Sequence, residues 1–305
     1  MTGDAVADAG AEPGARPSAS VVIPSFNRPD SLRACLDSLL SDPDETFEVV
    51  VVDDGGETPL EPVCADFGPR VRCLRQRNAG PAAARNAGAR AARADFLAFT
   101  DDDCRPRPGW VAALRAAAAG EPGRLIGGRV ENGLHGDPYA EASQSLCDYL
   151  YEYFGAAGGS AEFFTSNNIG CAVETFHRIG GFDETFPLAA AEDRDFGMRW
   201  CAEGGTLVYA PEAVVEHRHA MSLRRFWRQH SNYGRGARHL HGVMTGRGDA
   251  RPKIEPMRFY IGLVLHPLRG GRLSGVPQAA LMALSQVAMV FGYATEALSA
   301  GRKRA

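Results

Sequence analysis

The segment "FEVVVVDDGG" at 47–56 places four consecutive valines before two aspartates and two glycines. Because side chains alternate between the two faces of a sheet, a strand with such a run is apolar on both faces. Similar apolar runs occur at 20–26, 71–76 and 95–100, with helical stretches between them. This alternation predicts an α/β fold with a parallel sheet covered by helices on both sides.

The intervening stretches predict helices at 28–40, near 58–67 and at 80–93. Beyond Trp110 the pattern is less regular. There we expect strands at 125–130, 165–173 and 207–219, an aromatic-rich helix near 140–154, and a loop that enters a helix within 180–205.

Polar residues follow three of these strands, at Ser25 to Arg28, at Asp53 and Asp54, and at Asp101 to Asp103. Ligands of α/β sheets bind at the carboxyl ends of the strands. One crevice could therefore collect all three groups.

The three consecutive aspartates of "FLAFTDDDCRP" (96–106) need compensation, because like charges so close together repel. Two explanations stand side by side: an exposed turn solvated by water, or a hard-oxygen site for Mg²⁺ or Mn²⁺. In a D-x-D arrangement one carboxylate can contact ribose or phosphate while the other binds the metal.

Four blocks occur in a fixed order: "VVIPSFNRPDSL", "VVVVDDGG", "RNAGPAAARNAGARAARADFLAFTDDD" and "GGFDETFPLAAAEDRDFGMRW". Together they resemble the family 2 glycosyltransferases over roughly residues 19–220. The resemblance implies a GT-A fold, with a Rossmann-like mixed sheet flanked by helices. It also implies inverting, metal-dependent transfer from an NDP-sugar to a hydroxyl acceptor, with Mg²⁺ or Mn²⁺ as cofactor.

The same resemblance implies a nucleotide pocket lined by Pro24, Phe26, Asn27 and Arg28. Asp54, with Asp53 beside it, matches the carboxylate that accepts the N–H of the base. Uracil, thymine and guanine all offer such an N–H, so UDP, dTDP and GDP stay open as donors.

Further matched residues surround the diphosphate. Asn78 and Arg85 match a motif beside it, where a guanidinium could neutralise phosphate, although an exposed helix arginine is the simpler reading of Arg85. Asp101 and Asp102 are assigned to the donor, and Asp101 and Asp103 to the metal.

Glu192 and Asp193 match the Glu-Asp pair in which the aspartate is the catalytic base. A sugar hydroxyl needs a base because it is a poor nucleophile until its proton is accepted. Glu192 is assigned to orienting the loop or the acceptor. Both carboxylates could instead simply favour a helix N-terminus.

His217, in "VVEHRH", is assigned as the third metal ligand, because in related enzymes a histidine near this point completes the metal shell. Alternation from Val215 turns it inward, and His219 is its neighbour in the same segment. The alternative is a surface histidine.

Residues 218–305 carry 15 Lys and Arg against 3 acidic residues, a net charge of +12, whereas the whole chain is at −4. This asymmetry suggests an anionic partner, such as a membrane surface or a phosphorylated acceptor, and a solvated basic face is the alternative. The stretch 222–240 predicts a basic amphipathic helix, which could lie on a membrane or pack on the catalytic domain.

The stretch 276–300 contains no Lys or Arg and is interrupted by Gln286. It is borderline for a membrane span, which needs about 20 predominantly apolar residues. Three placements stay open: an interfacial helix, a helix packed on the catalytic domain, or a homodimer contact. We expect peripheral membrane docking.

The predicted organisation is a disordered lead (1–18), a GT-A catalytic domain (19–220) and a helical C-terminal extension (221–305). The domain divides into a nucleotide-binding half (19–110) and an acceptor-binding half (111–220). The lead lacks the apolar core of a signal peptide, and the seven cysteines form no C-x-x-C pair, so we expect a cytoplasmic protein, peripheral on the inner face of the membrane.

Two rival functions remain from the residues alone: a sugar-1-phosphate nucleotidyltransferase and a non-catalytic nucleotide-binding scaffold. The first would need a Gly-rich phosphate loop after the first strand, where this chain has "PSFNRPDS". The expected acceptor is a saccharide or a lipid-linked hydroxyl in cell-envelope or polysaccharide biosynthesis, and no nucleic-acid partner is expected.

Overall fold

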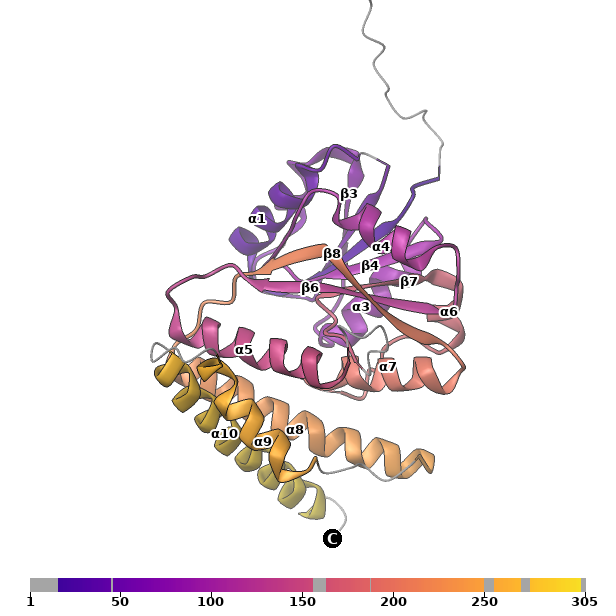
Figure 1. The fold of residues 1–305 in the computed structure, drawn as a ribbon. Helices are drawn as coiled ribbons and strands as arrows, with labels where there is room; N and C mark the ends of the chain where they lie inside the picture. Colours follow the sequence, from indigo (N-terminus) through magenta and orange to yellow (C-terminus); the bar gives the residue numbers. More distant parts are fainter. Residues whose placement is uncertain are drawn as a thin grey trace, which may run out of the picture.

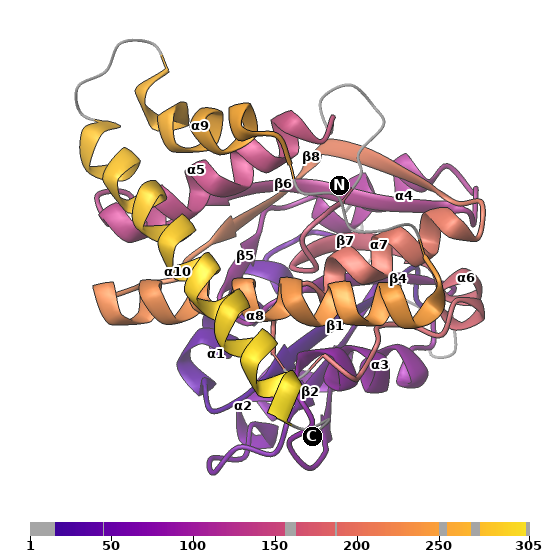
Figure 2. The same cartoon turned by 90° about the horizontal axis from the view of Figure 1, so that it is seen from below.

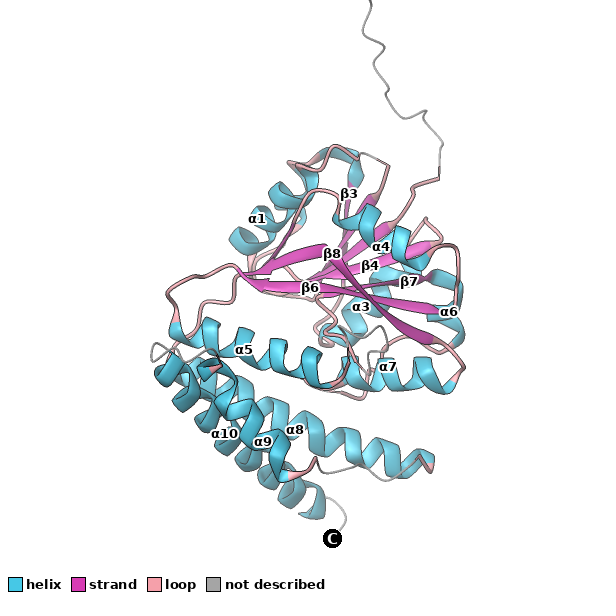
Figure 3. Cartoon of the chain, viewed as in Figure 1, coloured by secondary structure: helices cyan, strands magenta, loops and turns pink. Residues whose placement is uncertain are grey.

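The computed structural model of the chain describes residues 16–44, 46–155, 163–186, 188–249, 255–269 and 275–302. In this part of the chain, eight strands form one sheet with helices on both faces (Figures 1 and 3). The strands are β1 (Ser20–Ser25), β2 (Glu48–Asp53), β3 (Val71–Arg75), β4 (Phe96–Thr100), β5 (Cys104–Pro106), β6 (Arg124–Asn132), β7 (Asn168–Ala172) and β8 (Thr206–His217).

The helices fall into three groups by position. One face of the sheet carries α1 (Pro29–Leu40), α2 (Glu61–Ala65) and α4 (Trp110–Ala118), and the other carries α3 (Pro81–Ala91), α5 (Pro138–Tyr153), α6 (Val173–Arg178) and α7 (Glu192–Ala202). A third layer consists of α8 (Leu223–Arg247), α9 (Met257–Leu265) and α10 (Val276–Arg302), and short 3-10 turns occur at Gly68–Arg70 and His266–Leu268.

The strand order is β3-β2-β1-β4-β7-β6-β8-β5. The first four strands are parallel to their neighbours, as the apolar runs predict. Beyond them, β7 is antiparallel to both β4 and β6, β8 is parallel to β6, and β5 is antiparallel to β8. The sheet is therefore mixed, and the carboxyl ends of β1, β2 and β4 lie at one edge.

Strand β2 explains why the parallel half is buried on both sides. All six of its residues are buried. Val49 and Val51 pack in the cluster that contains α1, whereas Val50 and Val52 pack against α3. Helix α3 is rich in Ala and lies close to the sheet at Gly88, where an added Cβ would be only 2.4 Å from Val22 Cγ1.

The sequence patterns did not reveal α4, α6 and β5. Helix α4 begins after Gly109, which is left-handed (φ 81°), and no side chain caps it, so the usual polar start signal is missing. Strand β5 has three residues, too few to show a periodic pattern.

The helical C-terminal extension is confirmed, and it covers α5 and α7 on the side away from the sheet (Figure 2). Phe259, Leu263 and Met282 are buried in the core cluster that includes α5. Most of the predicted disordered lead, 1–15, lies outside the described residues, and so does 156–162 of the predicted acceptor-binding half. Within the lead, Arg16 forms an ion pair with Asp95 at 2.6 Å.

Candidate active site

Strand β4 ends at Thr100, and Asp101 to Asp103 form the turn from it into β5. Only 3% of Asp102 and 8% of Asp103 are exposed, whereas Asp101 is half-buried. Carboxylates as buried as these need specific partners, because burial disfavours the charged form. The turn is therefore not simply solvated.

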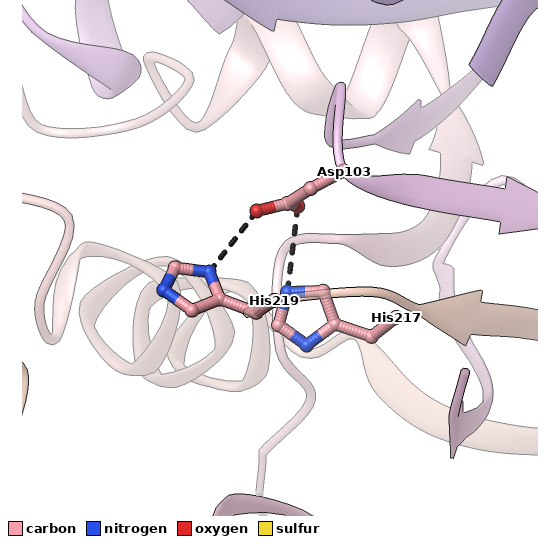
Figure 4. Close-up of side chains that lie close together, drawn as sticks. All are labelled: Asp103, His217 and His219. Carbon is pink, nitrogen blue, oxygen red and sulfur yellow. Dashed lines mark hydrogen bonds and ion pairs between the residues drawn. The ribbon is translucent and has the colours of Figure 1, made fainter. Parts of the chain in front are cut away.

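The partners of Asp103 include two histidines at the end of β8. Because β5 pairs with β8, with Cys104 opposite His217, the preceding Asp103 lies next to the end of that strand. His217 Nε2 lies 3.4 Å from Asp103 Oδ1, and His219 Nδ1 lies 3.1 Å from Oδ2. Both rings point at the carboxylate (Figure 4).

This pairing shifts the pKa values of the group. Burial alone would raise the pKa of Asp103, but the hydrogen bonds from the two histidines outweigh it and hold that pKa well below the usual range. Burial alone would lower the pKa of His217, but the contact with Asp103 raises it.

The same three side chains could hold a metal ion, since one ligand atom from each lies within 4.8 Å of the others. One carboxylate oxygen and two imidazole nitrogens suit a transition-metal dication such as Mn²⁺ better than Mg²⁺, which prefers oxygen ligands. Of the predicted ligands, Asp103 and His217 belong to this group. Asp101 does not, and His219 takes the third place.

Residue His219 could have been found from the sequence. Strand alternation from Val215 turns both His217 and His219 to the same side. The pattern is compatible with both histidines, but the prediction named only His217 as a metal ligand.

Arg28 also contacts this turn. Its Nη1 donates to Asp102 Oδ1 and to Asp103 Oδ2, each at 3.0 Å, and Ser25 Oγ donates to Asp102 Oδ2 at 2.7 Å. Burial raises the pKa of Asp102 to about 6 despite the nearby Arg28 charge. The guanidinium side chain is 48% exposed, so it also faces solvent at the site.

A second network forms around Arg85, which α3 presents to the carboxyl edge of the sheet. This side chain is 3% exposed; its Nη2 donates to Asp101 Oδ1 at 2.7 Å, and its Nη1 donates to Glu192 Oε1 at 3.2 Å. The exposed arginine considered as an alternative is therefore excluded. Arg85 links the aspartate turn to the start of α7.

Helix α7 begins abruptly at Glu192. The preceding Ala191 has a left-handed backbone (φ 70°), a conformation that costs a residue with a side chain about 1–3 kcal/mol and is concentrated at functional sites. The turn directs Glu192 into the interior, where Oε2 has no hydrogen-bond partner among the described residues. Asp193 is half-buried, and the N–H of Arg194 donates to its Oδ1 at 2.8 Å.

The two neighbouring carboxylates have raised pKa values. Burial, with the Asp193 charge beside it, raises the pKa of Glu192 to about 7, although Arg85 opposes the shift. Burial also raises the pKa of Asp193, against backbone hydrogen bonds from Arg194 and Ser166. Paired carboxylates with raised pKa values are typical of acid–base sites.

The two aspartates after β2 organise loops. Asp53 is fully buried and accepts hydrogen bonds from the N–H groups of Gly55 and Leu60 and from Arg75. Asp54 is 5% exposed and accepts from Gln76 Nε2 and from the N–H groups of Ala79 and Gly80. Direct contact of either carboxylate with a base stays a prediction.

The remaining predicted donor residues lie at the same edge. Phe26 is 45% exposed, Asn27 is left-handed (φ 55°), Asn78 is exposed, and Pro24 is half-buried in β1. The Asn27 side chain accepts from Thr58 N at 3.4 Å, which joins the loop after β1 to the loop after β2.

A cleft of about 490 Å³ lies between α5 and the strands β6 and β8. One face of α5 lines it with Gln144, Asp148 and Tyr151, and Tyr209 and Glu131 lie opposite. The Tyr151 hydroxyl is 3.0 Å from that of Thr165, the neighbour of the Ser166 that hydrogen-bonds Asp193. The cleft therefore approaches the carboxylate pair from the α5 side.

Comparisons with known proteins agree with this geometry. Residues 20–182 match the family described as Glycosyl transferase family 2, and residues 140–299 match Glycosyl transferase family group 2. A pre-mycofactocin glycosyltransferase of Mycobacterium tuberculosis (strain H37Rv) is 33% identical over 227 residues, which cover 72% of this chain and 46% of that protein. Glycosyltransferase AglE of Haloferax volcanii is 31% identical over 212 residues, 66% of this chain and 67% of that protein.

The chain spans about half the length of the mycobacterial relative. Among solved structures, the mannosyltransferase PcManGT from Pyrobaculum calidifontis in complex with GDP-Man and Mn²⁺ has a TM-score of 0.60 at 18% identity and covers 96% of this chain and 82% of its own. GalNAc-T7 with UDP, GalNAc and Mn²⁺ has a TM-score of 0.56 at 15% identity, over 81% and 54% of the two chains. The GT-A fold expected from the sequence is confirmed.

Proposed function

This chain belongs to glycosyl transferase family 2, and we propose that it moves a sugar from a nucleoside-diphosphate sugar to a hydroxyl group, with inversion at the anomeric carbon. One observation carries the proposal. The turn Asp101 to Asp103 joins two groups. Asp103 belongs to the cation-binding group that it forms with His217 and His219. Asp101 is linked through Arg85 to Glu192 at the start of α7. A single displacement needs a stabilised leaving group and a base close together.

We assign the donor diphosphate to the side of Asp103. A divalent cation held by Asp103, His217 and His219 would act as a Lewis acid on the leaving diphosphate. Arg28 is exposed beside these carboxylates and can donate to a phosphate oxygen. UDP, GDP and dTDP remain the candidate nucleotides.

Arg85 has a different part in this scheme. Two of its nitrogens already donate to Asp101 and Glu192, so its charge holds these carboxylates in place. It acts on the diphosphate through them, as a positioning residue.

We assign the base to Asp193. Glu192 is 3% exposed and bound to Arg85, whereas Asp193 is half-buried and its raised pKa improves it as a proton acceptor. Glu192 orients the loop and shares the proton equilibrium of the pair.

The acceptor fits the cleft along α5. Tyr151 and Tyr209 offer aromatic faces, and Gln144, Asp148 and Glu131 offer groups that hydrogen-bond hydroxyls. The lining also contains Arg129 and His135, but the carboxylates of Glu131, Asp148 and Glu152 outnumber them, so it suits a saccharide better than a phosphate.

The test is donor turnover. UDP-, GDP- and dTDP-sugars are screened with Mn²⁺ by thermal shift, because ligand binding raises the stability of the folded state. The stabilising donor is then assayed for sugar transfer and for slow hydrolysis. Metal-dependent release of the nucleoside diphosphate supports the proposal.

The matched variants are Asp103→Asn, which should lose the metal-dependent shift, and Asp66→Asn, which should keep it because Asp66 is exposed and pairs with Arg33. Donor binding without any turnover, with all saccharides tried, would instead favour a non-catalytic nucleotide-binding protein of this family. A nucleoside triphosphate consumed with a sugar 1-phosphate would favour the nucleotidyltransferase.

A further inference from the structure

Large apolar side chains are exposed mainly in the C-terminal layer. Eleven are exposed in the part of the chain that the structure describes, and nine of these lie between Leu223 and Leu298. Soluble monomers rarely leave such a concentration uncovered. The layer of α8, α9 and α10 forms the outermost face of the protein on that side (Figures 1 and 2).

Helix α10 contributes a continuous apolar stripe. Every exposed residue of this helix from Val276 to Leu298 is apolar. Among them, Val287, Val290 and Phe291 are 58%, 69% and 53% exposed and recur at helical spacing on one face.

The opposite face of α10 is closed against α8. A Cβ added to Gly292 would lie 1.8 Å from the carbonyl oxygen of Ser231, so the two backbones are in close contact. Glu296 accepts from Arg235 at 2.9 Å, so the helix keeps its polar groups on the protein side.

By length and composition alone, Val276–Ser299 could cross a membrane, with a mean hydropathy of 1.3. Crossing would carry Glu296, and the Arg235 bound to it, into hydrocarbon, where charged groups are costly. A helix whose polar face packs on the protein and whose apolar face is exposed can lie in the plane of the membrane interface.

Helix α9 repeats the pattern. Met257, Ile261 and Leu265 are 71%, 54% and 49% exposed and lie four residues apart on one face, and the exposed Arg258 borders them. Both stripes belong to the same outer layer (Figure 2).

Arginines without carboxylate partners occur in the same layer, on α8 and α9. Among the described residues, Arg224, Arg225, Arg228 and Arg258 are exposed and none forms an ion pair. A groove of about 380 Å³ between α8 and α10 combines Arg228 with Trp227 and Phe291, and the one carboxylate in its lining, Glu296, is paired with Arg235. Such sites suit a phosphate with an apolar tail beside it.

We propose that this layer docks on an anionic lipid surface, with the stripes of α9 and α10 in the interface and the arginines on phosphate headgroups. Charge decides against a second copy of the chain, because pairing the layer with itself would bring two parts of net charge +12 together. An anionic membrane complements both the apolar stripes and this charge.

The experiment is flotation of the full chain, without sugars, with vesicles of phosphatidylcholine and 30% phosphatidylglycerol, and with phosphatidylcholine alone. The protein should float with the anionic vesicles at low salt and be released at high salt. Val290→Asp combined with Phe291→Asp should reduce binding at least tenfold, whereas Ala116→Asp, on an exposed position of α4, should not.

Replacing Arg224, Arg225, Arg228 and Arg258 by Gln should weaken binding about fivefold for each arginine and flatten its salt dependence. Circular dichroism melts verify that each variant is folded. No flotation of the wild-type chain overturns the proposal. A second result would also overturn it: the wild-type chain is a dimer, the Val290→Asp, Phe291→Asp variant is a monomer, and neither binds vesicles. Because no sugar transfer is measured, the result does not depend on the proposed reaction.

Discussion

His219 Nδ1 lies 3.1 Å from Asp103 Oδ2, although 116 residues separate the two in the chain. This contact makes His219 a candidate metal ligand equal to His217. We predict that His219→Gln weakens Mn²⁺ binding by at least tenfold, because a carboxamide is a weaker ligand than an imidazole nitrogen. Isothermal titration with MnCl₂ measures it, with the exposed His177→Gln as control. Unchanged affinity in the His219 variant would remove it from the site.

Arg85→Met should destabilise the fold by about 3–5 kcal/mol, since it leaves Asp101 and Glu192 without their buried counter-charge. The control is Arg90→Met on the same helix, whose side chain is 61% exposed and which should cost less than about 1 kcal/mol. Urea unfolding compares the two. Equal losses would mean that the buried network does not hold the site together.

Asp193→Asn should lower turnover by roughly 10²–10⁴, the usual contribution of a positioned base, and leave donor affinity nearly unchanged. Steady-state kinetics and donor titration separate the two effects. Collapse of donor binding with turnover preserved would make Asp193 a donor-site residue.

The pKa of Glu192, raised by burial from 4.5 to about 7, predicts a pH effect on stability. The folded state then binds the proton of Glu192 more tightly than the unfolded chain does. The stability that this protonated carboxyl contributes is lost as pH rises from about 4.5 to about 7. The slope is at most about 1.4 kcal/mol per pH unit. Urea unfolding across this range should give a shallower slope for Glu192→Gln, and parallel curves would contradict the assignment.

Gly292→Val should separate α10 from α8, because the new side chain would meet the backbone of Ser231. Hydrogen exchange should then increase along α10 while the sheet stays protected. The control is Ala294→Val, an exposed position two residues on, which should leave exchange unchanged.

The parallel half of the sheet was predictable because each strand carries its own apolar run, as β2 does with its valines. The D-x-D pattern also singled out Asp103, whereas Glu192 and Asp193 came only from the resemblance to family 2 glycosyltransferases, and their roles stay predictions. The pairing of Arg85 with Glu192 was not predictable, since it joins residues 107 positions apart, one on α3 and the other at the start of α7. The partner of Asp101 was not predictable either. The D-x-D pattern assigns this carboxylate to the metal, whereas in the structure it accepts a hydrogen bond from Arg85.

The order of the strands has a consequence for how the protein folds. Strands β1 to β4 pair with one another within residues 20–100, whereas β8, the last strand, inserts between β6 and β5 and places Cys104 opposite His217. Closing that pair links segments separated by more than a third of the chain, and such long-range contacts form slowly. We therefore expect the nucleotide half to acquire protection early in refolding and the Asp103–His217–His219 group to assemble last. Chains interrupted before β8 would be folded in part but unable to form that group.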